Sequence, residues 1–355
     1  MNGHRIAIDA LGTRFGGAAY AMIQLAKTFE RCDDVAAVMV IAGRGSIVTE
    51  GLADSSLELV VVDLPPHGQL FWRAAWSVLR VPALLDRWQA SAMIAGAGML
   101  PRMPSCPVVA MLWNPAPFEA ASGLDRLRRS AIGWTARRAR AAAVPTQHMA
   151  DIVGAALAVE PVVVALAVDR DLFSPAADAG EEILVVSDFY AHKRHDIALA
   201  AYQRLPQPRP VMRFIGNPDA DPANYAALLE AVARLDAQRV VIQASVSRSE
   251  LIDAYRHARV FLMPSERESF SMPLAEAMCC GIPAVAREHP ALRETGGAGT
   301  AFVTGDSAEA WSAEIARLLT DDDLHRQRRA AAIRQGKRFS WELMAQQTLA
   351  IVGNT

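Results

Sequence analysis

Two glutamates eight positions apart are the residues of this sequence best suited to chemistry. Glu268 lies in a polar run, and Glu276 lies inside the apolar run LAEAMCC. An ionised carboxylate in apolar surroundings is costly unless it is paired or hydrogen-bonded. A carboxylate has two acceptor oxygens, and the neighbouring hydroxyls of a ribose or a hexose offer two donors. The pair therefore indicates that one carboxylate binds the hydroxyls of a ribose and the other binds those of a sugar. The alternative is a surface Glu268 with a Glu276 whose carboxylate reaches solvent.

The residues between the two glutamates predict the start of a helix. Ser271 suits the N-cap, Pro273 suits the first turn, and Gly281 with Pro283 suits the end of the helix. The expected strand 259–265 comes just before, so the helix begins at the carboxyl end of a strand. The free N–H groups and the positive dipole end of such a helix bind anions, which fits phosphates between a ribose and a sugar.

Lys193 and Arg194 stand near the expected start of another helix. Cations at a helix N-terminus oppose the helix dipole, so helix stability does not explain them. A bound anion would explain them, and solubilising surface charge is the alternative.

The elements that must position these residues are read from β-branched runs that alternate with helical patterns. Near-continuous apolar strands of this kind predict an α/β protein with parallel sheets covered on both faces. The segment 174–182 lacks periodicity and is the best linker candidate, so we expect two Rossmann-like halves around a central cleft. The expected strands are 5–9, 35–43, 57–63, 91–96, 107–113, 141–146 and 161–165, then 181–188, 211–216, 239–244, 259–265 and 282–287.

Length and composition fit this organisation. The chain has 355 residues, 52% apolar and 21% charged, which suits a globular protein of two domains. The formal net charge of −2 gives no basic field for nucleic acid. Four cysteines without C-x-x-C spacing indicate reduced thiols in a cytoplasmic protein. We expect neither a signal peptide nor a transmembrane helix.

The text PSERESFSMPLAEAMCCGIPAVA, residues 264–286, resembles the E-x7-E signature of retaining GT-B glycosyltransferases, in particular glycosyltransferase family 4. The matching positions are Glu268, Phe270, Pro273, Glu276, Ala277, Met278, Gly281 and Pro283. The resemblance implies a GT-B fold and the transfer of a hexose, with retention of configuration, from a nucleotide diphosphate sugar. It implies no metal and no cofactor besides this donor. The implied acceptor is a glycan or lipid-linked molecule in bacterial cell-surface polysaccharide or glycolipid synthesis.

The resemblance also implies roles for individual residues. Glu276 would hold the ribose, while Glu268 and Lys193 would form the catalytic centre. The donor-binding set would be Glu276, Ser269, Phe270, Ser271, Met272, Pro273, Leu274, Arg194, Gly16, Gly17 and Gly216.

This chain departs from the family pattern at three of the donor positions. Ser269 and Ser271 replace two family glycines, which narrows the backbone freedom near the ligand and adds hydroxyls. Asp188 stands where the family has a phosphate-binding Arg, and we expect Arg194 to compensate.

The first half would supply the acceptor side. Trp113 and Asn114 lie in LWNPAPF, which resembles the family text H-N-x-x-P-F with Trp in place of His; a strand-end turn is the alternative. Gly16 and Gly17 resemble the family's glycine-rich loop, and a simple turn is equally consistent.

Basic and aromatic residues of the first half fit an anionic membrane surface. Six arginines occur between residues 126 and 140, and residues 68–88 mix aromatic residues with arginine, with a break expected at Pro82. Peripheral docking on the inner face of the membrane would reach a lipid-linked acceptor. An ordinary solvated face over a core stripe is the alternative.

We therefore predict an N-terminal acceptor domain at 1–173, a donor domain at 174–336, and a final helix at 337–355 that crosses back. Asp219 and Asp221 match a D-x-D metal motif but are expected to precede and cap a helix that begins near Pro222. The rival functions are a non-catalytic nucleotide-sugar-binding protein of the same fold and a nucleotide-sugar epimerase.

Overall fold

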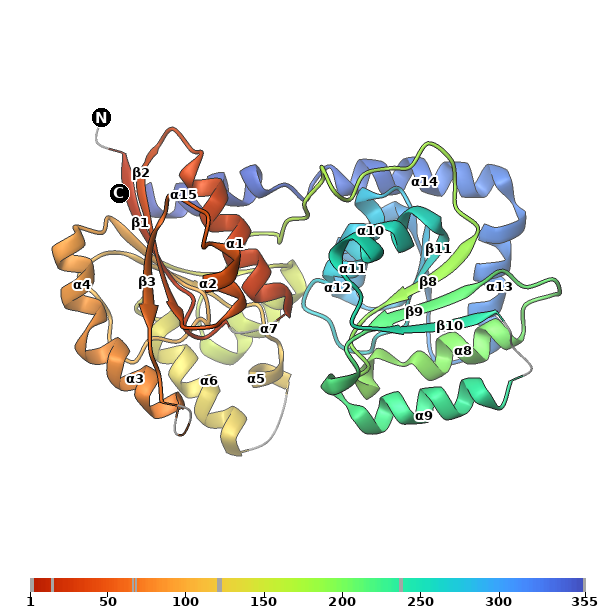
Figure 1. The fold of residues 1–355 in the computed structure, drawn as a ribbon, viewed down its shortest axis with the longest axis horizontal. Coiled ribbons are helices and arrows are strands. Elements are labelled where there is room, and N and C mark those ends of the chain that lie inside the picture. Colours follow the sequence, from red (N-terminus) through yellow and green to blue (C-terminus); the bar gives the residue numbers. More distant parts are fainter. Residues whose placement is uncertain are drawn as a thin grey trace. The chain divides into compact units, whose positions relative to one another are not determined.

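The computed structural model describes residues 3–13, 16–65, 67, 69–119, 123–235 and 239–353. The chain forms two compact units, Met1–Ala167 with Trp341–Thr355, and Val168–Ser340 (Figure 1). The boundaries lie at Ala167 and Ser340 rather than at residues 173 and 336. The backbone N–H of Val168 donates to the carbonyl of Phe339 at 3.3 Å. This bond joins the two segments that connect the units, and both bonded residues belong to the second unit.

The first unit is built on one parallel sheet of seven strands, in the order β3-β2-β1-β4-β5-β6-β7. Its inner strands are apolar at nearly every position, because helices cover both faces. The strands are β1 (His4–Asp9), β2 (Val35–Gly43), β3 (Glu58–Val62), β4 (Ala92–Ala95), β5 (Val108–Met111), β6 (Ala141–Val144) and β7 (Val162–Val163).

The helices of the first unit pack on the two faces of this sheet. Trp341 in α15 contacts Tyr20 in α1, with ring centroids 6.1 Å apart. Pro82 lies in the first turn of α4, so the expected break before this helix is confirmed. The helices are α1 (Gly16–Glu30), α2 (Ile47–Gly51), α3 (Gln69–Leu79), α4 (Val81–Trp88), α5 (Ala116–Glu119), α6 (Gly123–Ala136), α7 (Gln147–Leu157) and α15 (Trp341–Gly353).

The second unit has a parallel sheet of six strands, in the order β10-β9-β8-β11-β12-β13. Its strands are β8 (Glu182–Val186), β9 (Met212–Gly216), β10 (Val240–Ala244), β11 (Ala258–Met263), β12 (Ala284–Arg287) and β13 (Thr300–Val303). The edge strand β13 was not among the expected strands, because the run TAFV does not alternate and lacks a flanking apolar run.

Helices cover both faces of this second sheet. The chief hydrophobic core of the unit lies between the sheet and α8, α9 and α13, and α11 packs on α14 on the opposite face (Figure 1). The helices are α8 (His195–Gln203), α9 (Pro222–Ala233), α10 (Arg248–His257), α11 (Met272–Cys279), α12 (Pro290–Gly296), α13 (Ala308–Thr320) and α14 (Asp322–Gly336), with short 3-10 helices η1 (Ala191–Lys193), η2 (Pro218–Ala220) and η3 (Gly297–Gly299).

The strand order of each sheet fixes where a ligand is expected. In an open parallel sheet, the ligand binds beyond the carboxyl ends of the strands, where the strand order reverses. That point lies between β8 and β11 in the second unit, and between β1 and β4 in the first. The segment after β8 carries Lys193, and the segment after β11 carries Glu268.

Candidate functional site

The structure brings Lys193 and Glu268 into direct contact. The Lys193 Nζ donates to Glu268 Oε1 at 2.7 Å, and the Glu268 residue is only 8% exposed. The two segments also join through their backbones, because the N–H of Glu266 donates to the carbonyl of His192 at 2.8 Å. A buried carboxylate with a charged donor therefore lies where the strand order reverses. A ligand phosphate could accept a hydrogen bond from Lys193, and a ligand hydroxyl could donate one to Glu268.

Ser271 is the N-cap residue of α11, as expected, but its conformation is unusual. Its φ of 75° and ψ of 82° are left-handed, whereas an N-cap residue is ordinarily extended. Its hydroxyl makes no capping bond and is buried without a hydrogen-bond partner among the residues that the structure describes. The expectation that Ser271 caps the helix is therefore wrong in its chemistry, although right in its position.

The backbone before Ser271 is held from behind. The Thr295 hydroxyl, which is fully buried, donates to the carbonyl of Phe270 at 2.6 Å. The Phe270 ring packs edge-on against Phe339, with centroids 5.3 Å apart. These contacts fix the entry to α11 independently of any helix cap.

Glu276 lies in the middle of α11 and is half-buried. The Tyr255 hydroxyl donates to Glu276 Oε2 at 2.8 Å, and it also lies 3.1 Å from the Pro273 carbonyl. Burial raises the pKa of Glu276 from its ordinary value of 4.5 to about 7, although the bond from Tyr255 and the charge of Arg248 oppose this shift. Among the described residues, Tyr255 is the one hydrogen-bond donor to this carboxylate, so the carboxylate can still accept hydrogen bonds from ligand hydroxyls.

The other donor-side residues of the second unit have mixed surroundings. Met272, Pro273 and Leu274 form the first turn of α11, and Ser269 is half-buried in the loop before it. Gly216 ends β9 beside the end of β8, where a Cβ would lie 2.1 Å from the Ser187 carbonyl oxygen. Close strand packing is thus a sufficient reason for this glycine.

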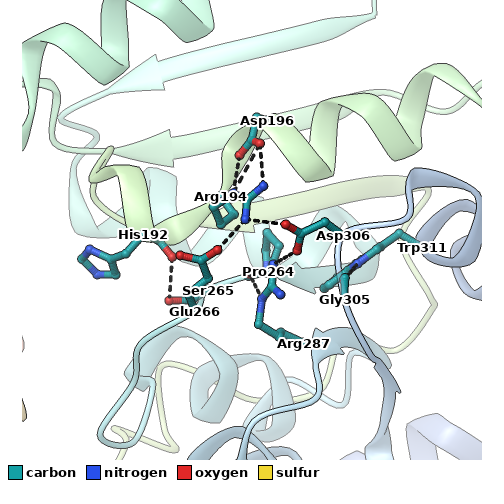
Figure 2. A network of polar contacts seen from close by, with 10 residues as sticks. All are labelled: His192, Arg194, Asp196, Pro264, Ser265, Glu266, Arg287, Gly305, Asp306 and Trp311. Carbon is teal, nitrogen blue, oxygen red and sulfur yellow. Dashed lines mark hydrogen bonds and ion pairs between the residues drawn. The ribbon is translucent and has the colours of Figure 1, made fainter. Parts of the chain in front are cut away.

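Arg194 does not extend a free guanidinium as expected for a phosphate ligand. It donates to three carboxylates: Asp196 at 3.0 Å, Asp306 at 2.8 Å, and Glu266 (Figure 2). These partners raise the pKa of Arg194. Arg194 thus joins the segments that follow β8, β11 and β13, and its expected compensation for Asp188 stays a prediction.

Arg287 continues this set of ion pairs. It donates to the Pro264 carbonyl at 2.9 Å and to Asp306 at 2.7 Å, so Asp306 lies between two guanidinium groups (Figure 2). Both arginines lower the pKa of Asp306. We call Arg194, Asp196, Glu266, Arg287 and Asp306 the arginine network. It ties together the segments that follow β8, β11 and β13, next to the Lys193–Glu268 pair.

The acceptor-side residues belong to the first unit. Trp113 is 9% exposed, and the Asn114 side chain accepts from the N–H of Ala116 at 3.0 Å, which starts α5. Asn114 thus makes the strand-end turn that the sequence left as the alternative. Gly16 and Gly17 form the first turn of α1.

One buried carboxyl group of the first unit was missed in the sequence. Asp9 ends β1, is 7% exposed, and accepts from the N–H of Leu11 at 3.0 Å. Burial raises its pKa. It lies at the reversal point of its sheet, and an acid directly after the apolar strand RIAI was the pattern that could have revealed it.

The described ranges contain no metal cluster and no membrane-spanning helix. Within them, no cluster of three or more His, Cys, Asp or Glu side chains could hold a metal ion. Asp221 caps α9 by accepting from the N–H of Asn224 at 3.1 Å, as the sequence predicts. None of the described helices is long and apolar enough to span a membrane.

The sequence is similar to those of known glycosyltransferases. Residues 170–338 match the model of the glycosyl transferases group 1 family. A D-inositol 3-phosphate glycosyltransferase of Kineococcus radiotolerans is 32% identical over 236 residues, which cover 58% of this chain and 54% of that protein. An O-antigen chain mannosyltransferase B of Escherichia coli is 37% identical over 95 residues, covering 27% and 25% of the two chains. The chain spans about half the length of the first curated relatives it matches.

Solved structures match the whole fold. A glycosyltransferase of Rickettsia africae superposes with a TM-score of 0.80 at 16% identity, covering all of both chains. Anabaena HepE in complex with UDP-glucose also has a TM-score of 0.80 at 16% identity, covering 99% of this chain and 100% of that one. The chain therefore has the GT-B glycosyltransferase fold, and its residues 170–338 match the glycosyl transferases group 1 family.

Proposed function

We propose that this protein is a retaining glycosyltransferase that moves a hexose from a nucleotide diphosphate sugar to a glycan or lipid-linked acceptor. The observation that carries this proposal is the Lys193–Glu268 pair at the reversal point of the sheet, between η1 and the N-terminus of α11. A cation, a helix N-terminus and two carboxylates there match the three parts of such a donor.

Each part of the donor has a residue to receive it. The ionised Glu276 carboxylate accepts hydrogen bonds from the ribose hydroxyls. The diphosphate is bound by Lys193 and by the N–H groups at the start of α11. Glu268 accepts from the hexose hydroxyls. As the bond between the anomeric carbon and the phosphate oxygen breaks, Lys193 stabilises the charge on the leaving diphosphate. The acceptor oxygen bonds to the anomeric carbon on the same face and gives its proton to the departing phosphate, so no further cofactor is used.

The names of the relatives support this substrate class. They include an inositol-phosphate glycosyltransferase and an O-antigen mannosyltransferase, and the HepE structures contain UDP and UDP-glucose. A role in bacterial cell-surface polysaccharide or glycolipid synthesis, in the cytoplasm, fits these relatives.

Exposed apolar residues of the first unit support docking to an anionic membrane. Phe71 is 68% exposed and Leu79 72% exposed on α3, and Leu127 is 68% exposed on α6 beside the exposed Arg126 and Arg128. Apolar side chains with neighbouring arginines suit the interface of an anionic bilayer. Cosedimentation with vesicles containing phosphatidylglycerol tests this, and binding should weaken in Phe71→Ala.

One observation favours a non-catalytic nucleotide-sugar-binding protein instead. Asp188, at the position of a family arginine, accepts from the N–H of Asn217 at 3.3 Å, so it serves loop structure and adds negative charge near the site. Product formation separates the two candidates, because a binding protein would take up the nucleotide sugar and return it unchanged.

Calorimetry with UDP, GDP, ADP and dTDP, and with their hexose derivatives, tests the proposal. At least one nucleotide sugar should bind the wild type, and Glu276→Ala should lose this binding. Tyr255→Phe is the matched control, because it removes the donor to Glu276 but leaves the carboxylate in place. Unchanged binding in Glu276→Ala would show that Glu276 does not bind the nucleotide sugar, and the proposed site would be wrong.

A further inference from the structure

We propose that a cavity in the second unit, at the edge of the sheet where the strands begin, is a second ligand site for an organic phosphate monoester. The cavity has a volume of about 520 Å³, which is enough for a small molecule. Three arginines line it: Arg209, Arg239 and Arg259. The cavity contains no residue of the proposed donor site, so this inference stands or falls independently of the proposed function.

The cavity lies at the opposite edge of the sheet from the candidate donor site. Its lining comes from the segments that lead into β8 and β9, from Arg239 directly before β10, and from Arg259 at the start of β11. Lys193 and Glu268 instead follow the carboxyl ends of β8 and β11. The five residues of β8 separate the two edges by roughly 17 Å, at about 3.3 Å per residue. A ligand in this cavity would therefore leave the donor site open.

The guanidinium group of Arg209 is held in place by backbone carbonyls. Its Nε donates to the carbonyl of Leu205 at 2.9 Å, and its Nη2 donates to the carbonyl of Gln203. It also lies over the ring of Tyr202, 5.7 Å from the ring centroid. These contacts at the end of α8 fix the position of the guanidinium group, but none of them neutralises its charge.

Arg239 lacks such a set of contacts in the described part of the chain. It is exposed, and its Nη1 donates to the carbonyl of Arg209 at 3.3 Å. Among the described ion pairs, Arg259 is joined to Asp322 at 2.6 Å, whereas neither Arg209 nor Arg239 has a carboxylate partner. Glu181 is the one carboxylate among the described lining residues, so positive charge prevails in the cavity.

The lining favours a phosphate that is attached to an apolar body. A phosphate monoester carries close to two negative charges and has three terminal oxygens, so it can bind more than one guanidinium group. A carboxylate matches the fork of a single arginine. The apolar part of the wall would pack against the body of the ligand, and it includes Leu205, Pro206, Pro208, Pro210 and Leu319.

Calorimetry of the full-length protein with phenyl phosphate as the probe tests this inference. The wild type should bind phenyl phosphate about tenfold more tightly than inorganic phosphate or benzoate, because the first lacks the apolar body and the second has less charge. Arg239→Ala should weaken the binding of phenyl phosphate at least about tenfold, since it removes a hydrogen bond between charged groups. Because Arg239 is exposed, this variant should fold, and an unchanged melting temperature would verify that.

Arg234→Ala is the matched control. Arg234 is an exposed arginine of the same unit that pairs with Glu230 and does not line the cavity, so its variant should keep wild-type affinity for phenyl phosphate. Lys193→Ala should keep it as well. The inference would be overturned by a wild type that binds no phenyl phosphate, by wild-type affinity in Arg239→Ala, or by equal affinity for inorganic phosphate or benzoate. A loss in Lys193→Ala without a loss in Arg239→Ala would also overturn it, because the probe would then occupy the donor site.

Discussion

Lys193 and Arg194 are adjacent cations that differ in their ion-pair partners. Within the described part of the chain, the Lys193 ammonium pairs with the buried Glu268, in a site where Ser271 and Glu276 still have bonding capacity. Arg194 belongs to the arginine network, in which three carboxylates share its guanidinium. The candidate site is thus under-satisfied, and the network beside it is saturated.

This difference shows how the second unit separates binding from support. A group that must receive a ligand keeps an unfilled donor or acceptor, which lowers the stability of the free protein. Supporting residues fill their bonds and keep the loops in place. Variants in the two regions should therefore differ in what they change: ligand binding and turnover in the site, stability in the network.

The largest effect is expected from Lys193→Ala. Loss of the cation on the leaving diphosphate should lower kcat by about 10²–10³-fold, as for removal of one donor that stabilises developing charge. Steady-state kinetics with the identified donor measures this. The variant should also lose about 1–3 kcal/mol of stability, because Glu268 is left buried and unpaired.

The double variant Lys193→Ala, Glu268→Gln separates these two losses. The neutral amide removes the unpaired charge, so urea unfolding should return towards wild type, while kcat should stay well below that of Glu268→Gln alone. Recovery of kcat together with stability would mean that Lys193 has only a supporting role, and the contrast with Arg194 would disappear.

The next effect is the pH dependence of Glu276. Its folded pKa of about 7 lies above its ordinary value of 4.5, so the folded state holds the proton more tightly. This contribution to stability is complete below pH 4.5 and is lost as the pH rises through 7. Between pH 6 and pH 8 the free protein should lose about 1.4 kcal/mol from this group. Glu276→Gln should lack that difference in urea unfolding.

Nucleotide binding should change with pH in the opposite direction. The ribose hydroxyls need the ionised carboxylate, so the Kd should be about tenfold higher at pH 6 than at pH 8. A Kd that is constant over this range would exclude Glu276 as the ribose ligand, even if Glu276→Gln flattens the stability profile.

Much of the fold could be predicted because its pattern is local. Apolar strands between helices predict both parallel sheets, and the expected strand 35–43 coincides with β2. The edge strand β13 escaped prediction, since TAFV has no period of its own and is defined by its pairing with β12. The other three edge strands, β3, β7 and β10, lie within the expected strands 57–63, 161–165 and 239–244, so β13 is the exception.

The candidate site could be predicted only as positions along the chain. The E-x7-E spacing located Glu268 and Glu276, but the partners of the neighbouring cations are distant in sequence. Lys193 and Glu268 are 75 positions apart, and Arg194 and Asp306 are 112 apart. Ser271 was expected to cap α11, because serine ordinarily does so in an extended conformation. In the structure, Thr295 instead donates to the carbonyl of Phe270, the residue before Ser271, and the Ser271 backbone is left-handed.

Arg194→Ala should weaken the network rather than the site. Removing the shared guanidinium leaves Asp196, Glu266 and Asp306 close together, and we expect a loss of about 1–2 kcal/mol in urea unfolding. The Kd for the nucleotide should stay within about threefold of wild type. Arg194→Gly removes the same side chain but accommodates the φ of 53°, so it should be more stable than the alanine variant. A tenfold loss of affinity in both variants would restore Arg194 to the phosphate site.

The smallest effect is expected from Asp306→Asn. The amide keeps an oxygen for Arg194 and Arg287 but removes the charge, and the Asp306 side chain is 51% exposed. Exposed ion pairs contribute little, so the loss should be about 0.5–1 kcal/mol in urea unfolding at low salt. Because salt screens such pairs, the difference from wild type should shrink further in 1 M NaCl, while nucleotide affinity stays unchanged in both conditions. A loss of affinity that persists in high salt would show that the network shapes the candidate site directly, so that support and binding are not separate in this unit.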